Sequence, residues 1–158
     1  MPVSKTKRRI GFAAFLLIFL PLALGSCRNR TDGPPVIRYG KDVCGECRMI
    51  ISEERFAAAA ADRNGNAVKF DGVGCLLRYR QEHPELEKIW VKSYGSGEWL
   101  DAAAAFFVFS EQISAPMGYG LAAEASKNGA QKLADEVRGR VFDFEELIAS
   151  LKQTGTNS

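Results

Sequence analysis

The sequence predicts an α+β fold, a single domain of two β-β-α-type modules with mostly antiparallel strands. Short strand-like segments, a hairpin turn and three capped helical segments follow one another in the order β-β-α and then β-β-β-α-β-α. The chain contains neither a GxGxxG motif nor a phosphate-binding loop, so it lacks the usual signatures of a nucleotide-binding parallel sheet.

The first module opens with Arg48–Ser52, which is rich in large apolar residues and is expected to be a strand. Arg55–Asp62 and Ala67–Phe70 are separated by "RNGN", a strong hairpin signal. The five consecutive alanines in this module favour a helix by propensity. Because their segment is short and the turn follows directly, we predict a strand.

A helix is expected to close the first module, from about Gly72 to Glu82. Asp71 can cap its N-terminus, and Pro84 ends it. One face of this helix carries Val73, Leu76, Leu77 and Arg80.

The second module begins with the strand-like segments "IWVKSY" and "AAFFVF", joined through a turn that contains Gly95 and Gly97. "GLAAEA" is a third strand, and "RVFDF" is a last short one. Ser126 and Asp143 are the expected caps of two helices, of which the second runs through Lys152. The first of these helices turns four residues inward, Ala130, Leu133, Ala134 and Val137.

Residues 1–26 read as a lipoprotein signal peptide. A cationic head precedes the uncharged run Ile10–Leu24, which is shorter than the ~20 residues of a membrane span. Leu24-Gly25-Ser26-Cys27 resembles a bacterial lipobox, which predicts lipidation at Cys27. The alternatives are an ordinary cleaved signal followed by a structural cysteine and, because of Arg8-Arg9, twin-arginine export.

The rest of the chain divides by composition into a lipid-anchored flexible tether at 27–36, a folded domain at 37–152 and a frayed tail at 153–158. Cleavage after residue 26 removes four of the 21 Lys+Arg and none of the 19 Asp+Glu, so the formal charge of +2 becomes −2. Nothing in this balance indicates nucleic-acid binding.

The number of cysteines is informative for an exported protein. If Cys27 carries lipid, three thiols remain, at Cys44, Cys47 and Cys75. In an oxidising compartment an odd number cannot all pair within the chain. At least one of them must therefore be buried, metal-bound or reactive.

The stretch "VCGECRMIIS" combines two of these cysteines with a methionine. In an extended strand, Cys47 and Met49 would face the same way and could converge on one ion. A thiolate and a thioether are soft donors that select Cu(I) over hard ions. Structural zinc sites use thiolate and imidazole and seldom a thioether.

Met117 is the other methionine outside the signal peptide, and it lies in the Gly- and Pro-rich segment "APMGYG". Such a loop presents a side chain instead of burying it. For each methionine alone, a role as core filler is the competing interpretation. Their placement, one beside a cysteine and one on a loop, favours the ligand interpretation.

Three further interpretations of the sulfur residues stay open. Cys75 lies in the first turn of a predicted helix, where a buried structural thiol is the expectation. A zinc site of Cys44, Cys47, Cys75 and His83 is formally possible, but the spacing is not that of a zinc finger. Cys44 to Cys47 is also a C-x-x-C, as in thiol–disulfide oxidoreductases, with Ala115-Pro116 as a possible counterpart of their proline loop.

Several sequence blocks together resemble the NosL family of nitrous oxide reductase accessory lipoproteins. They are the lipobox, "YGKDVCGECRMIIS", "RFAAAAADRNGNAVKFDGVGCLLRY", "WVKSYGSGEWLDAAAAFFV", "APMGYGLAA" and "VFDFEEL". The likeness implies two β-β-α-type modules in one α+β domain. It also implies a periplasm-facing copper(I) chaperone that helps supply nitrous oxide reductase together with an ABC-type membrane complex.

The resemblance also implies which residues bind copper. The family's C-x-M pair falls on Cys47 and Met49, and its loop methionine falls on Met117. Cys44 is carried over less firmly, because some family members have only the cysteine of the C-x-M pair. Gly72 stands where the family often has a second acid, so no carboxylate pair can be assigned beside Asp71.

We therefore expect a lipid-anchored copper(I) carrier and not an enzyme, facing the periplasm or the cell exterior. The expected metal residues are Cys47, Met49, Met117 and Cys44. The alternatives are an oxidoreductase using Cys44 and Cys47, a structural lipoprotein with a buried sulfur cluster, and a general copper-trafficking lipoprotein unrelated to nitrous oxide reduction.

Overall fold

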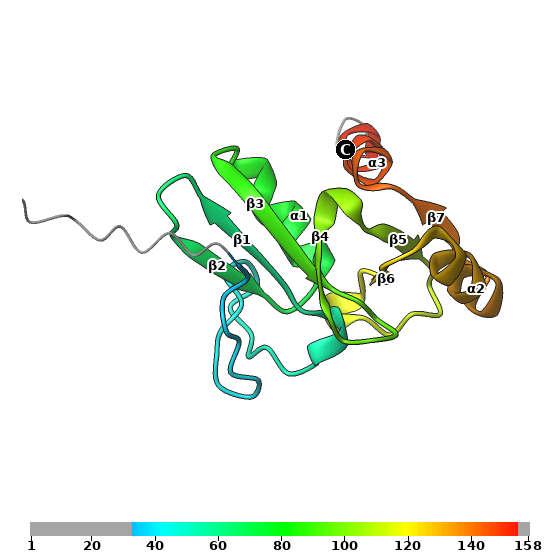
Figure 1. Cartoon of the computed structure of the whole chain (residues 1–158), viewed down its shortest axis with the longest axis horizontal. Helices are drawn as coiled ribbons and strands as arrows, with labels where there is room; N and C mark the ends of the chain where they lie inside the picture. The colour runs from blue at the N-terminus through cyan, green and yellow to red at the C-terminus, as the bar shows by residue number, and fades with distance from the viewer. Residues whose placement is uncertain (1–32, 155–158) are drawn as a thin grey trace, which may run out of the picture.

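The computed structural model describes residues 33–154, which form two antiparallel sheets and three α-helices (Figure 1). The first sheet has the order β2-β1-β3-β4, with strands Ala58–Asp62 (β1), Ala67–Phe70 (β2), Leu86–Lys92 (β3) and Trp99–Asp101 (β4). The second has the order β6-β5-β7, with strands Phe106–Phe109 (β5), Leu121–Glu124 (β6) and Arg140–Phe142 (β7). The helices are Val73–Glu82 (α1), Lys127–Val137 (α2) and Phe144–Thr154 (α3). The α+β prediction is confirmed.

The two sheets are joined where β3 ends. Ser93 forms a parallel bridge with Ala123, and the backbone N–H of Tyr94 donates to the Ala123 carbonyl at 2.7 Å. The segment "IWVKSY", which was expected to open the second module, instead belongs to the first sheet: β3 pairs with β1 on one side and with β4 on the other, because its long-range pairing crosses α1. Figure 1 shows α1 packed along this sheet and α2 and α3 gathered around the second one.

The alanine-rich strand β1 occupies the interior of the first sheet, between β2 and β3. Its alanines 58–61 are at most 1% exposed. Ala58 and Ala60 belong to the same core cluster as Leu76 of α1 and Phe70 of β2. The strand prediction is therefore confirmed, because a fully buried position between two partner strands outweighs the helix propensity of alanine.

Two of the predicted helix caps are present. The Ser126 hydroxyl accepts from the Gly129 N–H at 3.1 Å. At α3, the Asp143 carboxylate accepts from the Glu146 N–H at 2.8 Å and the Glu146 carboxylate accepts from the Asp143 N–H at 3.0 Å, which is a capping box. Both helices therefore begin where the sequence predicted.

The predicted cap of α1 is wrong. Gly72 is the N-cap, with no side-chain hydrogen bond. Asp71 turns its carboxylate toward the preceding segment instead and accepts from the Ser52 N–H at 3.3 Å. Pro84 ends the helix as expected, since α1 stops at Glu82.

Strand β4 was not predicted, because its three residues are too few for an alternating pattern. Within residues 33–154, no helix has the length and apolar character that a membrane crossing requires. The predicted signal peptide, the lipidation site Cys27 and most of the tether lie outside the described residues.

Candidate metal site

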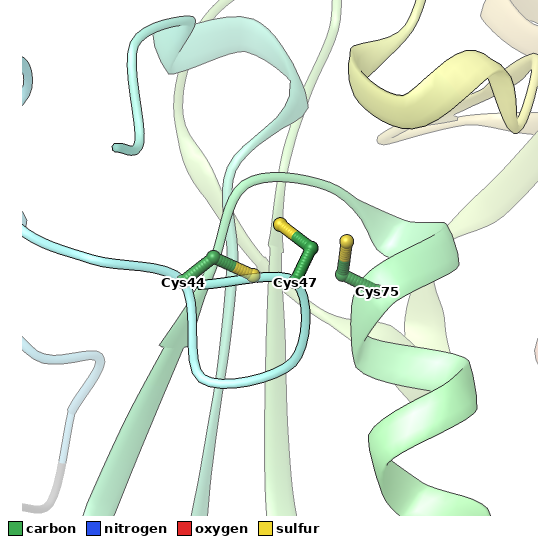
Figure 2. A group of neighbouring side chains, drawn as sticks. All are labelled: Cys44, Cys47 and Cys75. Carbon is green, nitrogen blue, oxygen red and sulfur yellow. The ribbon is translucent and has the colours of Figure 1, made fainter. Parts of the chain in front are cut away.

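Three cysteines from two segments meet at one edge of the first sheet. Cys44 and Cys47 belong to a loop before β1, and Cys75 lies in the first turn of α1 (Figure 2). Their Sγ atoms all lie within 4.8 Å of one another. Three sulfurs bound to one ion at about 2.3 Å in a trigonal plane would lie about 4 Å apart. The cluster therefore has the dimensions of a three-sulfur metal site.

The loop that carries Cys44 and Cys47 is a tight turn. The Cys44 N–H donates to the Met49 carbonyl at 2.8 Å, and the Arg48 N–H donates to the Cys44 carbonyl at 3.1 Å. An isolated antiparallel bridge between Val43 and Ile50 closes it. The turn places Cys44 and Cys47 side by side, so that both sulfurs lie close to that of Cys75 (Figure 2).

The predicted strand Arg48–Ser52 is wrong, and so is the strand geometry that placed Cys47 and Met49 on one face. Arg48 has φ +65°, a left-handed conformation that interrupts any extended run. Met49 and Ile50 are 59% and 54% exposed, whereas Ile51 is fully buried. The apolar composition that predicted a core strand belongs to a largely exposed turn.

The cysteine loop is fixed on β2 at close range. The Gly45 N–H donates to the Lys69 carbonyl at 2.8 Å. A Cβ at Gly45 would lie 2.3 Å from Cγ1 of Val68, so only glycine lets the loop approach the strand this closely.

Asp42 adds an electrostatic link at the same place. Its carboxylate accepts from the Arg38 backbone N–H at 3.0 Å, from the Arg38 Nε at 2.9 Å and from the Lys69 Nζ at 2.6 Å. These three hydrogen bonds hold the pKa of Asp42 well below its usual range, and the one from the Arg38 backbone N–H has the largest effect. Asp42 thereby joins the segment that enters the cysteine loop to strand β2.

Asp42→Asn should lower the stability at neutral pH, and the deficit should shrink in acid. Because the folded-state pKa of Asp42 is depressed, its contribution is complete above the unfolded pKa of about 3.9 and is lost as the pH falls through the folded value. Urea unfolding of both proteins from pH 7 to pH 3 measures this. Asp135→Asn on α2 is the control. A deficit that stays constant down to pH 3 would contradict the ionic role.

The three thiols are not equivalent. The pKa of Cys44 falls to about 5, chiefly because its sulfur accepts a hydrogen bond from the Cys75 thiol and further ones from backbone N–H groups of Asp71, Cys47 and Glu46. The hydrogen bond to Cys44 and burial raise the pKa of Cys75, and burial raises that of Cys47. The metal-free cluster therefore holds one thiolate supported by two thiols, and a bound ion would displace the remaining protons.

Access to the cluster is one-sided. Cys44 and Cys75 are completely buried, whereas Cys47 is half-buried. An incoming ion or an exchanging ligand would therefore meet the Cys47 sulfur first.

Both predicted methionine ligands face solvent. Met117 is 58% exposed and lies in the 3-10 turn Pro116–Gly118 (η3), where it has φ +60°. With Met49 at 59%, the interpretation of either methionine as a core filler is wrong. The loop of Met117 is held close to α1, because the ring of Tyr119 lies against Gly74, next to Cys75.

The sequence matches the NosL family over residues 35–151, which is most of the chain. The chain belongs to the NosL family. A solved structure described as the copper chaperone NosL from Shewanella denitrificans has a TM-score of 0.66 at 16% identity. The match covers 72% of this chain and 94% of that one, and at this identity it shows a shared fold. None of the curated proteins matches the sequence.

In this NosL chain, sequence reasoning assigned Cys75 to the core and did not join it to the other two thiols. Cys75 is indeed buried, but its sulfur completes the cluster. The one available signal was its position at the start of a helix directly after Asp71, where helix and cysteine loop can approach each other. Nothing local in the sequence gives the distance between the two segments.

The structure separates His83 from the cysteines. His83 is the C-cap of α1, eight residues or about 12 Å along the helix from Cys75. It stacks on Tyr79 at 3.9 Å and contacts Glu85 at 2.9 Å. The four-ligand zinc site that included His83 is therefore not formed.

The arrangement of the cysteines in this NosL chain also differs from that in a thiol oxidoreductase. Such enzymes place an accessible, low-pKa cysteine at a helix N-terminus. Here Cys44, whose pKa is lowered, is buried in a loop, and the accessible Cys47 has a raised pKa.

Proposed function

We propose that this chain is a lipid-anchored copper(I)-binding chaperone that delivers copper for the assembly of nitrous oxide reductase. The observation that carries the proposal is the convergence of Cys44, Cys47 and Cys75 within 4.8 Å. Membership of the NosL family and the shared fold with a solved copper chaperone support it.

The donor set favours copper(I) as the cargo. Three soft sulfurs select Cu(I) over oxygen-seeking ions, and Cu(I) is stable with three ligands. Structural zinc sites require four. Among the described residues, no His, Asp or Glu joins the three cysteines as a fourth ligand.

Release of the ion would proceed by exchange of ligands, one sulfur at a time. Cys47 is the reachable member of the cluster, and Met49 and Met117 offer thioethers at the surface. A thioether binds Cu(I) without losing a proton and cannot form a disulfide. We therefore assign Cys44, Cys47 and Cys75 to the main binding of the ion, and Met49 and Met117 to additional thioether contacts that strengthen binding and take part in uptake and transfer.

The location and the partners extend this proposal. Leu24-Gly25-Ser26-Cys27 supports a lipid anchor at Cys27, which would keep the domain at a bacterial membrane, facing the periplasm or the cell exterior. The recipient would be apo-nitrous oxide reductase, with an ABC-type membrane complex as the accessory. A general copper-trafficking role is the alternative and would leave the same metal site in use.

Cys27→Ser should move the protein from the membrane fraction to the soluble or uncleaved pool, because the acyl chains that hold it would be missing. Fractionation with radiolabelled fatty acid measures this, and Cys75→Ser is the control that keeps the anchor. Equal incorporation of label with and without Cys27 would contradict the lipoprotein assignment.

Met49→Leu and Met117→Leu should weaken copper(I) binding without unfolding the protein. Leucine has nearly the volume of methionine but no donor atom, so the free energy of unfolding should change by less than about 1.5 kcal/mol. Anaerobic competition with a chromogenic Cu(I) chelator measures the affinity. Exposed Ile50→Leu is the matched control, since it lies beside Met49 and carries no sulfur. If both methionine variants bind Cu(I) as tightly as wild type, neither thioether is a copper ligand.

The decisive experiment for the proposal is anaerobic Cu(I) titration followed by metal analysis, beside an assay of disulfide turnover. We expect one Cu(I) per chain and no catalytic turnover. Turnover of a disulfide substrate that Cys44→Ser abolishes, without stable Cu(I) binding, would support the oxidoreductase alternative instead.

A further inference from the structure

Arg78 joins the two loops that carry the sulfur residues. It lies on α1 one turn beyond Cys75, and its side chain is 64% exposed. Its Nε contacts the Glu46 carboxylate at 3.1 Å, and its Nη1 donates to the Tyr119 hydroxyl at 3.4 Å. One guanidinium thus bridges the cysteine loop and the loop of Met117.

Both partners of Arg78 lie close to proposed metal ligands. Glu46 stands between Cys44 and Cys47 and is 23% exposed. Tyr119 follows Met117 by two residues. A movement of either partner would therefore move a sulfur donor with it.

The Tyr119 ring is seated independently of its hydroxyl group. A Cβ at Gly74 would lie 2.1 Å from the Tyr119 Cγ, so the ring rests directly on the first turn of α1. The hydroxyl is left to accept from Arg78 at the surface. Packing thus brings the Met117 loop to the helix, and Arg78 connects it to the cysteine loop.

We propose that Arg78 is a positioning residue that holds the Glu46 and Tyr119 loops together over the sulfur cluster and slows release of the bound ion. This inference rests on the proposed function. The planar fork of arginine can serve both partners at once, which a lysine ammonium does less well. The contacts are exposed and individually weak, so they can open during transfer without unfolding the domain.

Arg78→Ala should speed the release of Cu(I) about three- to fivefold, the factor expected for loss of one exposed ion pair with its hydrogen bond. Stopped-flow transfer to a chromogenic chelator measures the rate, using the full-length chain purified in detergent. The control is Arg63→Ala, which removes an exposed arginine–glutamate pair with Glu87 on the first sheet. Equal release rates in wild type and Arg78→Ala would overturn the proposal.

A second readout does not depend on the metal. In the copper-free protein, Arg78→Ala should increase hydrogen exchange at residues 44–49 and 116–120, and the control should not. If the wild type fails to bind Cu(I), the proposed function is wrong, but this exchange still tests the bridge. Unchanged exchange in both loops would overturn it.

Charge exchange separates the bridge from a general structural effect. Glu46→Arg and Arg78→Glu should each release Cu(I) faster, and the double variant should return to within about twofold of wild type. In that variant the new arginine at position 46 and the new carboxylate at position 78 can form the ion pair between the cysteine loop and α1 again, with the charges reversed. A double variant that stays as fast as the single ones would contradict the assignment.

Discussion

Replacing Cys47 with serine should remove most of the copper(I) binding. Serine keeps the shape of cysteine but replaces a soft sulfur with a hard oxygen, which Cu(I) does not favour. Cys47 is also the half-buried member of the cluster, through which we expect the ion to enter. We expect at least a hundredfold loss of affinity, about 2.7 kcal/mol, in anaerobic competition with a chelator.

Cys75→Ser tests the contribution that only the structure revealed. With two of three thiolates left, the affinity should fall at least tenfold, and Cys44→Ser should behave alike. Both positions are buried, so a serine hydroxyl left there without a hydrogen-bond partner would destabilise the fold. Alanine variants at the same two positions control for this effect. If Cys75→Ser and Cys75→Ala bind Cu(I) as tightly as wild type, Cys75 is a core thiol and the ion is held without it.

Gly120→Ala, at a buried loop position, should cause a large loss of stability. Gly120 has φ +63°, and a Cβ there would lie 2.4 Å from the Ser110 carbonyl oxygen, a backbone atom that cannot rotate away. The left-handed conformation costs alanine about 1–2 kcal/mol. The steric clash adds about 1–3 kcal/mol.

Gly118→Ala is the matched control for this substitution. Gly118 has φ +71° but nothing within 4 Å of its added Cβ, so it carries the conformational cost alone. Urea unfolding should therefore show both variants destabilised and Gly120→Ala clearly more so. Equal losses would mean that the Gly120 loop moves away from β5 at little cost.

Sequence alone predicts the local parts of this fold well. The "RNGN" hairpin, the Ser126 and Asp143 caps and the stop at Pro84 depend on neighbouring residues, and the structure contains all of them. Pairing of β3 with β1 across α1 depends on contacts between distant segments, and no local pattern encodes it. The error at Arg48–Ser52 came from its apolar side chains, which suggested burial although a left-handed residue turns two of them outward.

In the candidate site, too, the features set by neighbouring residues could be predicted from the sequence, and the contact between distant segments could not. Cys44 and Cys47 were recognisable as candidate ligands because they lie within four consecutive residues. Met117 was recognisable because it lies between proline and glycine, which indicate a loop. Cys75 could not be joined to them, since its distance from Cys47 is set by how α1 packs on the sheet.

The alanine strand β1 therefore has a meaning beyond filling the core. Helix α1, which carries Cys75, packs against β1 and against its sheet neighbour β2, on which the cysteine loop rests, and the side chains of β1 there are single methyl groups. A larger residue at Ala58 or Ala60 would push α1 away from the sheet and draw the Cys75 sulfur away from the other two. The spacing of the three sulfurs therefore depends on the small side chains of Ala58 and Ala60 as well as on the cysteines themselves.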